Sequence, residues 1–259
     1  MTTPPADPTV RLVTETAERL LALWASRPEI RHPGWDRPFR PLADLLPTAD
    51  LDFAAHNPQM VPLLWYPALR HGPTARPVIE VFDHLPEGLG APLPRRQDLS
   101  RIYAWALASH TALRWIADRL DGRPLLEVGA GSGYWAHLLR HQGLDVLATD
   151  AEARTEHNGW TSRFRYTDVR PGHAPADAAA HPDRALALLW PPHRDPMAAD
   201  ALRAYRGEAL LYLGDGPGGL CADDAFFAEL EARWRPVSSC PLTLRWLGNR
   251  DRALFYHRR

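Results

Sequence analysis

Five residues of this chain have the types and the spacing for ligand chemistry: Glu127, Gly129, Gly131, Gly133 and Asp150. The glycines alternate with other residues, and because they lack Cβ atoms they can adopt positive φ and let a ligand lie against the backbone. A helix that begins just after them would point its N–H groups and its dipole at a bound anion. The glutamate suits an ammonium group, and the aspartate suits a pair of ribose hydroxyls. The pattern therefore predicts a site for a small nucleoside ligand.

The elements that must hold these residues are two parallel strands with a helix between them. Apolar Leu125, Leu126 and Val128 precede the first glycine, as in a central parallel strand. Residues 135–140 have the pattern of a helix, and residues 145–150 that of a second strand ending in a carboxylate. In open α/β sheets, ligands bind at the carboxyl ends of the strands, where this segment places its glycines and its second acidic residue.

The spelling Glu-x-Gly-x-Gly-x-Gly at 127–133 resembles motif I of class I S-adenosylmethionine (SAM) dependent methyltransferases, and the resemblance covers roughly residues 99–259. It implies an α/β fold: a Rossmann-like, doubly wound sheet of seven strands whose last strand pair is antiparallel, with SAM as the cofactor. An NAD site is one alternative, but its fingerprint requires a glycine at Tyr134, where helix and strand pack closely. A strand–helix turn without a ligand is the other alternative.

The remaining pattern divides the chain into two regions, residues 1–98 and residues 99–259. In the first, apolar residues at helical spacing predict a helix over 10–25, and prolines from 27 to 94 exclude long helices. The many aromatic residues there favour an irregular, packed extension with short helices, which we expect to cover the SAM cleft and supply a substrate pocket. In the second region, further patterns predict helices over 99–120, 197–205 and 223–234 and strands over 162–169, 186–190, 209–213, 242–246 and 253–256.

Two further positions are candidates for contact with SAM. Tyr103, with Trp105, lies on the predicted helix before the first strand, and the resemblance implies contact with the methionine end of SAM from this region. Core packing is the alternative for Trp105. Asp168 lies near the end of the predicted third strand, where the resemblance implies an acid near the adenine amine; a turn aspartate is the alternative reading.

The acceptor site is predicted at Leu189-Trp190-Pro191-Pro192-His193, at the end of the fourth strand. This segment is similar to the Asn/Asp-Pro-Pro-Tyr motif of amine-directed methyltransferases, in which the polar residue and a proline carbonyl hold the target nitrogen. Here Trp190 replaces the polar residue and His193 replaces the aromatic one. An indole can only donate a hydrogen bond, although its face attracts cations such as a methylsulfonium. The segment therefore suggests nitrogen methylation without establishing it, and a purely structural strand end is the alternative.

Asp215, in the glycine-rich loop after the fifth strand, is a candidate base or partner for a substrate ammonium, with a turn aspartate as the alternative. His56, His110 and His193 are the histidines considered as proton acceptors; a packed or solvated histidine is the alternative for each. No spacing of histidine, cysteine and acidic residues predicts a metal site.

Composition excludes several classes of function. The net charge is −1 and no stretch is strongly basic, which argues against nucleic acid as the main partner. All 30 basic residues counted as Lys and Arg are arginines, so lysine Schiff-base chemistry and a phosphate-loop lysine are excluded. No apolar run is long enough for a membrane span, and neither a signal peptide nor a disulfide framework is indicated. We therefore expect a cytoplasmic protein, and the Ala/Arg/Pro-rich usage is typical of a GC-rich bacterial genome.

The leading prediction is an enzyme that transfers a methyl group from SAM to an N or O atom of a small molecule or a peptide product. The first alternative is a SAM-binding, methyltransferase-like protein that acts as a non-catalytic partner or regulator. An NAD oxidoreductase and a nucleic-acid methyltransferase are lesser alternatives. The sequence carries no signal for an oligomeric state.

Overall fold

The computed structural model describes residues 46–60, 67–71, 77–81, 96–151, 161, 165–246 and 248–259, together with a few helical positions between 11 and 22. The predicted helix over 10–25 therefore lies largely outside the described residues. Within the described residues, no helix combines the length and the apolar character that crossing a membrane would require.

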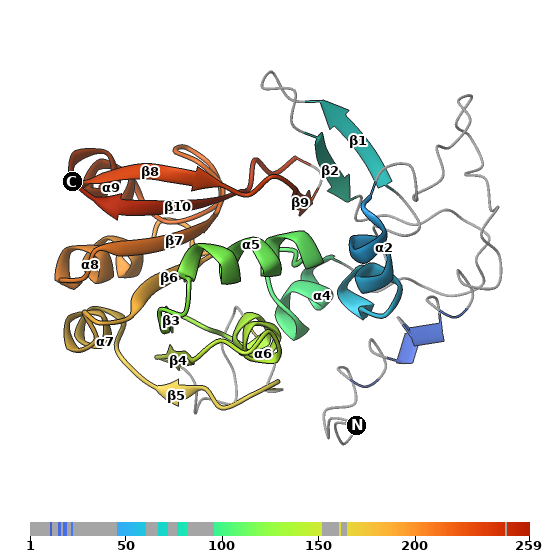
Figure 1. Ribbon diagram of the computed structural model, residues 1–259, viewed down its shortest axis with the longest axis horizontal. Helices are drawn as coiled ribbons and strands as arrows, with labels where there is room; N and C mark the ends of the chain where they lie inside the picture. The colour runs from blue at the N-terminus through green and yellow to red at the C-terminus, as the bar shows by residue number, and fades with distance from the viewer. Residues whose placement is uncertain are drawn as a thin grey trace.

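A seven-stranded sheet forms the centre of the chain, with the strand order β5-β4-β3-β6-β7-β10-β8 (Figure 1). The five strands from β5 to β7 pair in parallel, whereas β10 is antiparallel to both β7 and β8. This order confirms the predicted fold class, including its antiparallel end. The strands are β3 (Leu125–Val128), β4 (Val146–Asp150), β5 (Arg170–Pro171), β6 (Ala185–Leu189), β7 (Ala209–Gly214), β8 (Trp234–Ser239) and β10 (Arg252–Arg258).

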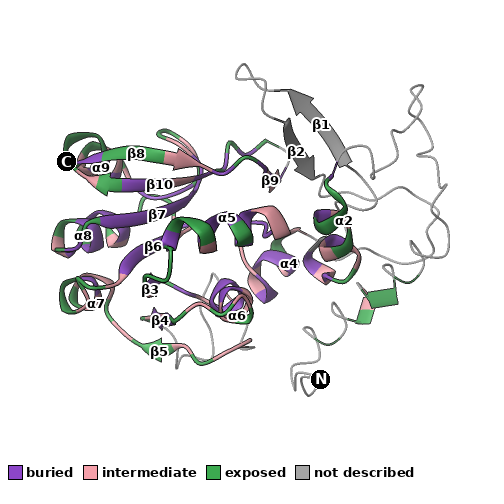
Figure 2. Ribbon diagram, in the orientation of Figure 1, coloured by how far each residue is buried: buried purple, intermediate pink, exposed green. Residues whose placement is uncertain are grey.

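Helices cover both faces of this sheet because its central strands are apolar on both sides (Figure 2). One face packs against α4 (Arg96–Ile102), α5 (His110–Leu120) and α6 (Tyr134–His141). The other face packs against α7 (Ala174–Ala180), α8 (Met197–Ala204) and α9 (Asp224–Arg233). The strand order runs outward from β3 in both directions, so the switch point lies between β3 and β6, where open α/β sheets bind ligands.

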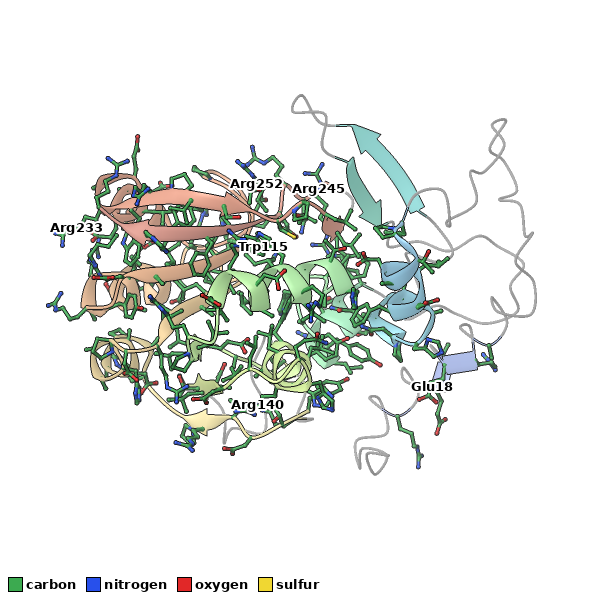
Figure 3. All side chains as sticks on the ribbon, viewed as in Figure 1. Glu18, Trp115, Arg140, Arg233, Arg245 and Arg252 are labelled. Atoms are coloured by element: carbon green, nitrogen blue, oxygen red, sulfur yellow. The ribbon has the colours of Figure 1, made fainter. Side chains whose placement is uncertain are left out.

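The two strands predicted to form the final antiparallel pair, over 242–246 and 253–256, do not pair with each other. Strand β9 (Thr243–Trp246) leaves the main sheet and pairs in parallel with β2 (Pro77–Val81), which pairs with β1 (Pro67–His71). The partner of β10 is β8, which the sequence pattern did not predict. Proline within β8 suits an edge strand, because an edge strand leaves one row of N–H groups outside the ladder. Trp115 of α5, labelled in Figure 3, fastens this edge by donating from Nε1 to Ser238 Oγ at 3.1 Å.

The predicted helix over 99–120 is two helices, α4 and α5, separated by residues 103–109. No glycine or proline breaks it. Instead, long-range donors bind the carbonyls of the intervening segment: Gln59 Nε2 donates to Ala104 O at 2.9 Å and Trp135 Nε1 donates to Ala106 O at 3.3 Å. Ser109 then caps α5, accepting from Ala112 N–H at 3.0 Å. The break turns residues 103–105 toward the carboxyl ends of the strands, where they line a cavity.

The extension contacts the second region through helix α2 (Thr48–Ala55), the 3-10 turn η2 (Pro58–Met60) and β2. Helix α2 and turn η2 agree with the prediction of short helices, whereas strands β1 and β2 were not predicted. Asp50 is buried and accepts hydrogen bonds from both the N–H and the hydroxyl of Thr111, at the start of α5. Asn57 donates to the hydroxyl of Tyr134, the first residue of α6.

Candidate functional site

A cavity of about 400 Å³ opens at the carboxyl ends of β3, β4 and β6. Its volume lies within the range of about 300–1,000 Å³ that is typical of small-molecule sites. The cavity is lined by parts of segments 100–105, 127–135, 149–151, 161, 172–175 and 189–200. It therefore brings together the predicted cofactor residues Tyr103, Glu127, Gly129, Gly131 and Asp150 with the predicted acceptor residue Trp190.

The backbone of the glycine turn forms one wall of this cavity, and residues with a side chain would not fit at these positions. Gly129 and Gly131 have φ of 69° and 56°, and a Cβ on Gly131 would lie 2.7 Å from Thr161 Cγ2. The N–H of Gly131 donates to Asp150 Oδ2 at 2.8 Å, so the acid at the end of β4 also shapes the turn. The sequence spacing had placed these groups together, and the structure holds them at the edge of one cavity.

Gly133 has a different place from the other two glycines. It is the N-cap of α6 with φ of 72°, and it does not line the cavity. A Cβ at this position would lie 2.7 Å from Val169 Cγ2 and 3.1 Å from Thr167 Cγ2. Its lack of a side chain therefore serves the close packing of the segment before β5 onto the turn, whereas the prediction assigned it to the ligand.

Glu127 is the most unusual titratable group in the cavity. It is buried, the N–H of Ala136 in the first turn of α6 donates to its carboxylate, and Oε2 has no hydrogen-bond partner. Burial raises the pKa of Glu127 to about 8; Asp150 adds to the rise and Arg140 opposes it. A buried carboxyl oxygen without a partner is costly unless a ligand supplies the donor. An ammonium group is the donor that suits it best, because it would also compensate the buried charge.

Tyr134 occupies the position where an NAD fingerprint requires glycine. The residue is buried, and its ring packs edge-on against Tyr103 and Tyr166 with centroids 5.4 and 5.0 Å apart. Burial raises the pKa of Tyr134, which keeps its hydroxyl neutral as the acceptor of the Asn57 hydrogen bond. A large ring is therefore built into the helix start, where a dinucleotide fold needs close helix–strand packing.

Trp190 follows β6 and forms an aromatic wall of the cavity together with Trp105. The two rings stack with centroids 5.4 Å apart and planes 18° apart. Trp190 has φ of 62°, a left-handed conformation that bulky residues rarely adopt and that costs of order 1–3 kcal/mol. Two hydrogen bonds hold it there: the backbone N–H donates to Leu213 O at 2.6 Å and Nε1 donates to Asp251 Oδ1 at 3.1 Å.

Asp251 is a site residue that sequence reasoning missed, because it lies 61 positions from the indole that it binds. It is buried, and burial raises the pKa of Asp251 to about 6, although the Trp190 hydrogen bond opposes the rise. Asn249 stands beside it and accepts from Arg96 at 3.1 Å, which links this loop to the start of α4. The wall is therefore fixed from behind by a buried polar network.

The rest of the proline segment does not take the arrangement of the amine-directed motif. The carbonyl of Pro191 accepts from Ala222 N–H at 3.1 Å, so the backbone uses the group that would hold a target nitrogen. Pro191 and His193 do not line the cavity, and His193 is exposed. A tight loop whose backbone is hydrogen-bonded to Ala222 takes the chain from β6 to α8, and this pairing decides where the side chains point.

Asp215 is a turn aspartate, which was the alternative interpretation of this residue. Its carboxylate accepts from the N–H groups of Gly216 and Leu220 at 2.9 and 3.1 Å, and Arg250 approaches it at 3.4 Å. Asp215 is buried in the loop and does not line the cavity. The loop's glycines allow it to fold back on this carboxylate, which explains why the side chain does not face the cleft.

Three other candidates lie away from the cavity. Asp168 precedes β5, its side chain is 73% exposed, and it pairs with Arg170 at 3.7 Å. The predicted third strand over 162–169 does not form at its described residues 165–169, because β5 begins only at Arg170. His56 Nδ1 donates to Asp52 O at 2.8 Å on the surface, and His110 is the first residue of α5.

Several cavity residues had no signal in the sequence. Asp195, Met197 and Asp200 at the start of α8 line the cavity, as do Ser100 of α4 and His173 before α7. Except for Ser100, they lie at or just before helix starts, which only the sheet order brings to one cavity, and a single sequence does not encode that neighbourhood locally. Within the described ranges, no three residues among His, Cys, Asp and Glu are grouped for a metal. Cys221 and Cys240 are both buried.

The strand order, the antiparallel end and the glycine turn between β3 and α6 together decide the fold. The chain has a Rossmann-like, doubly wound α/β fold with an antiparallel end, as the resemblance to class I methyltransferases predicts. No protein-family model matches the sequence, and no match was found among the curated proteins compared with it. Among solved structures, the chain is similar to a ribosomal protein L11 methylase from Lactobacillus delbrueckii subsp. bulgaricus, with 18% identity, a TM-score of 0.33, and coverage of 75% of this chain and 100% of that one.

Proposed function

We propose that this chain is a SAM-dependent methyltransferase that acts on an N or O atom of a small molecule or a peptide product. The observation that carries the proposal is the position of Glu127, Gly131 and Asp150 around one cavity at the switch point of the sheet. Glu127 Oε2 lacks a donor and suits the ammonium of the methionine moiety. Asp150 lies where it can accept from ribose hydroxyls while it holds the Gly131 N–H.

The fit to SAM rests on the chain's own groups. A ligand can approach the backbone at the turn because the glycines carry no Cβ. A Cβ on Gly131 or Gly129 would meet a neighbouring side chain at 2.7 or 3.0 Å. Bound SAM supplies an activated methyl group on a sulfonium. The protein's part is to orient the acceptor in line with that methyl group and to exclude water, and the stacked indoles of Trp105 and Trp190 form an apolar wall suited to both tasks.

A specific observation favours a second candidate, a SAM-binding protein without catalytic activity. Trp190 stands where the amine-directed motif has a polar residue, and the Pro191 carbonyl is bound by the backbone. If the wall fills the acceptor space, the chain binds SAM and its product S-adenosylhomocysteine but transfers no methyl group.

Calorimetric titration with S-adenosylhomocysteine and with NAD tests the cofactor assignment. We expect the first ligand to bind and the second not to bind; the reverse result would overturn the proposal. Turnover of methyl-labelled SAM in the presence of pooled amine, alcohol and peptide acceptors then separates the two candidates. Cofactor binding without label transfer to any acceptor would support the non-catalytic candidate.

A further inference from the structure

The cavity extends beyond the residues assigned to the cofactor. Its second half lies one strand farther along the sheet, at the end of β6 and the start of α8, and is formed by Trp105, Trp190, Pro192, Asp195 and Asp200. Glu127 and Asp150, the acids assigned to the cofactor, belong instead to β3 and β4. The second half is therefore the part of the cavity available to an acceptor.

The charge of the described lining residues is one-sided. Among the described residues that line the cavity, four are acidic and none is arginine, in a chain with 30 basic residues that are all arginine. His173 is the one described lining residue that can gain a positive charge, and it lies before α7. After the cofactor has used Glu127 and Asp150, Asp195 and Asp200 remain for the second half. A cleft lined by one sign of charge concentrates ligands of the opposite sign.

Both remaining carboxylates are accessible from solvent. Asp195 and Asp200 are exposed, and Asp195 Oδ1 accepts from Met197 N–H at 2.9 Å. Within the described part of the chain, no arginine forms an ion pair with Asp195. Asp200 pairs with Arg203 at 3.3 Å, but both side chains are about half exposed, and such pairs are weak enough for a ligand to compete.

The aromatic wall provides an independent reason to expect the same ligand charge. The faces of tryptophan rings are the strongest aromatic binders of ammonium and guanidinium groups. The chain holds Trp190 in a rarely adopted backbone conformation through Asp251 and Leu213 and stacks it on Trp105. A strained, rigidly held aromatic residue in a cavity is a feature of ligand sites.

We propose that the acceptor carries a positive charge, an ammonium or a guanidinium group, which binds between the Trp105–Trp190 wall and the carboxylates of Asp195 and Asp200. This inference rests on the proposed function, because it assigns the other half of the cavity to the cofactor. The indole faces and the two carboxylates together distinguish such an acceptor from neutral and anionic molecules of the same size.

Three probes that share a phenylethyl group and carry a positive, a neutral or a negative end group test the proposal on protein saturated with S-adenosylhomocysteine: 2-phenylethylamine, 2-phenylethanol and 3-phenylpropanoate. By calorimetry we expect the amine to bind at least fivefold more tightly than the alcohol, and the carboxylate to bind least. The preference for the amine should shrink as NaCl is added, because salt screens the attraction to exposed carboxylates such as those of Asp195 and Asp200.

Variants localise the effect. Asp195→Asn with Asp200→Asn should reduce the preference for the amine to near parity while the affinity for S-adenosylhomocysteine stays unchanged. Asp183→Asn, an exposed aspartate outside the cavity, is the matched control and should leave the preference intact. If the double variant does not fold, the series on the wild-type protein still decides.

The outcomes separate this inference from the proposed function. Equal binding of the three probes, a preference for the alcohol or the carboxylate, or no binding of the amine at millimolar concentration overturns the inference while the cofactor site stands. Failure of S-adenosylhomocysteine itself to bind overturns the proposed function.

Discussion

Cofactor binding is expected to release a proton, because Glu127 lines the cavity, is buried and has a carboxylate oxygen without a hydrogen-bond partner. Burial raises the pKa of Glu127 to about 8, so at pH 7 the carboxyl is about nine-tenths protonated in the unliganded protein. The ammonium of the cofactor binds the ionised form. Binding at pH 7 should therefore release close to one proton.

The sign and the size follow from linkage. A raised pKa means that the unliganded fold favours the neutral carboxyl, and ionising it at pH 7 costs about 1.4 kcal/mol. This cost grows as the pH falls further below 8 and vanishes above it. The dissociation constant of S-adenosylhomocysteine should therefore fall by about tenfold per pH unit between pH 6 and pH 8. Arg140 and Asp150 are the charged groups that contribute to the pKa of Glu127, with opposite signs.

Calorimetry in buffers of different ionisation enthalpy, such as phosphate and Tris, measures the proton release directly. The matched variant is Glu127→Gln, whose amide oxygen can still accept from Ala136 N–H but does not titrate. We expect this variant to bind more weakly at pH 8, without proton release and with a flat pH profile. Its thermal stability relative to the wild type should improve as pH rises toward 8. The folded wild type keeps Glu127 protonated whereas the unfolded chain ionises it, so the stability of the wild type falls over this range.

The reasoning is refuted by a specific result. If the wild-type protein binds S-adenosylhomocysteine with no proton release at pH 7 and with an affinity that does not change between pH 6 and pH 8, Glu127 does not face the ligand's ammonium.

Three further substitutions test the site. Asp150→Ala should raise the dissociation constant of S-adenosylhomocysteine by about tenfold or more in calorimetry, because charge-assisted hydrogen bonds of about 1.5–3 kcal/mol are lost; an unchanged constant would place the ribose elsewhere. Gly131→Ala should abolish binding in a protein that still melts cooperatively, because φ is 56° and the Cβ would meet Thr161 at 2.7 Å; retained affinity would separate the ligand from this turn. Asp251→Ala should lower the unfolding free energy by about 1–3 kcal/mol in urea and change the near-ultraviolet circular dichroism of the Trp105–Trp190 pair, whereas Asp251→Asn, which keeps an acceptor oxygen, should do so less.

The sequence by itself determined the parts that depend on neighbouring residues. The alternation of glycines after an apolar strand requires a turn with positive φ, and the spacing to Asp150 fits one helix and one strand; the structure has all of these. The helix predicted over 223–234 begins where expected, because Asp223 is the N-cap of α9 and accepts from Phe226 N–H only three residues away. Such features are local, so their residue types carry the information.

Tertiary structure decided the features that depend on distant partners. Residues 103–109 have a helical pattern, yet they leave the helix because Gln59 and Trp135 donate to their carbonyls. The pattern of β9 predicts a strand but does not specify which sheet it joins, and it pairs with β2, more than 160 positions away.

The acceptor side of the cavity depends on distant partners in the same way. The indole of Trp190 is fixed by Asp251, and the carboxylate of Asp215 is retained by its own loop. Each of these outcomes is set by which buried polar group finds a partner after the sheet has assembled. Spacing along the chain does not contain that information, because the partners become neighbours only in the folded protein.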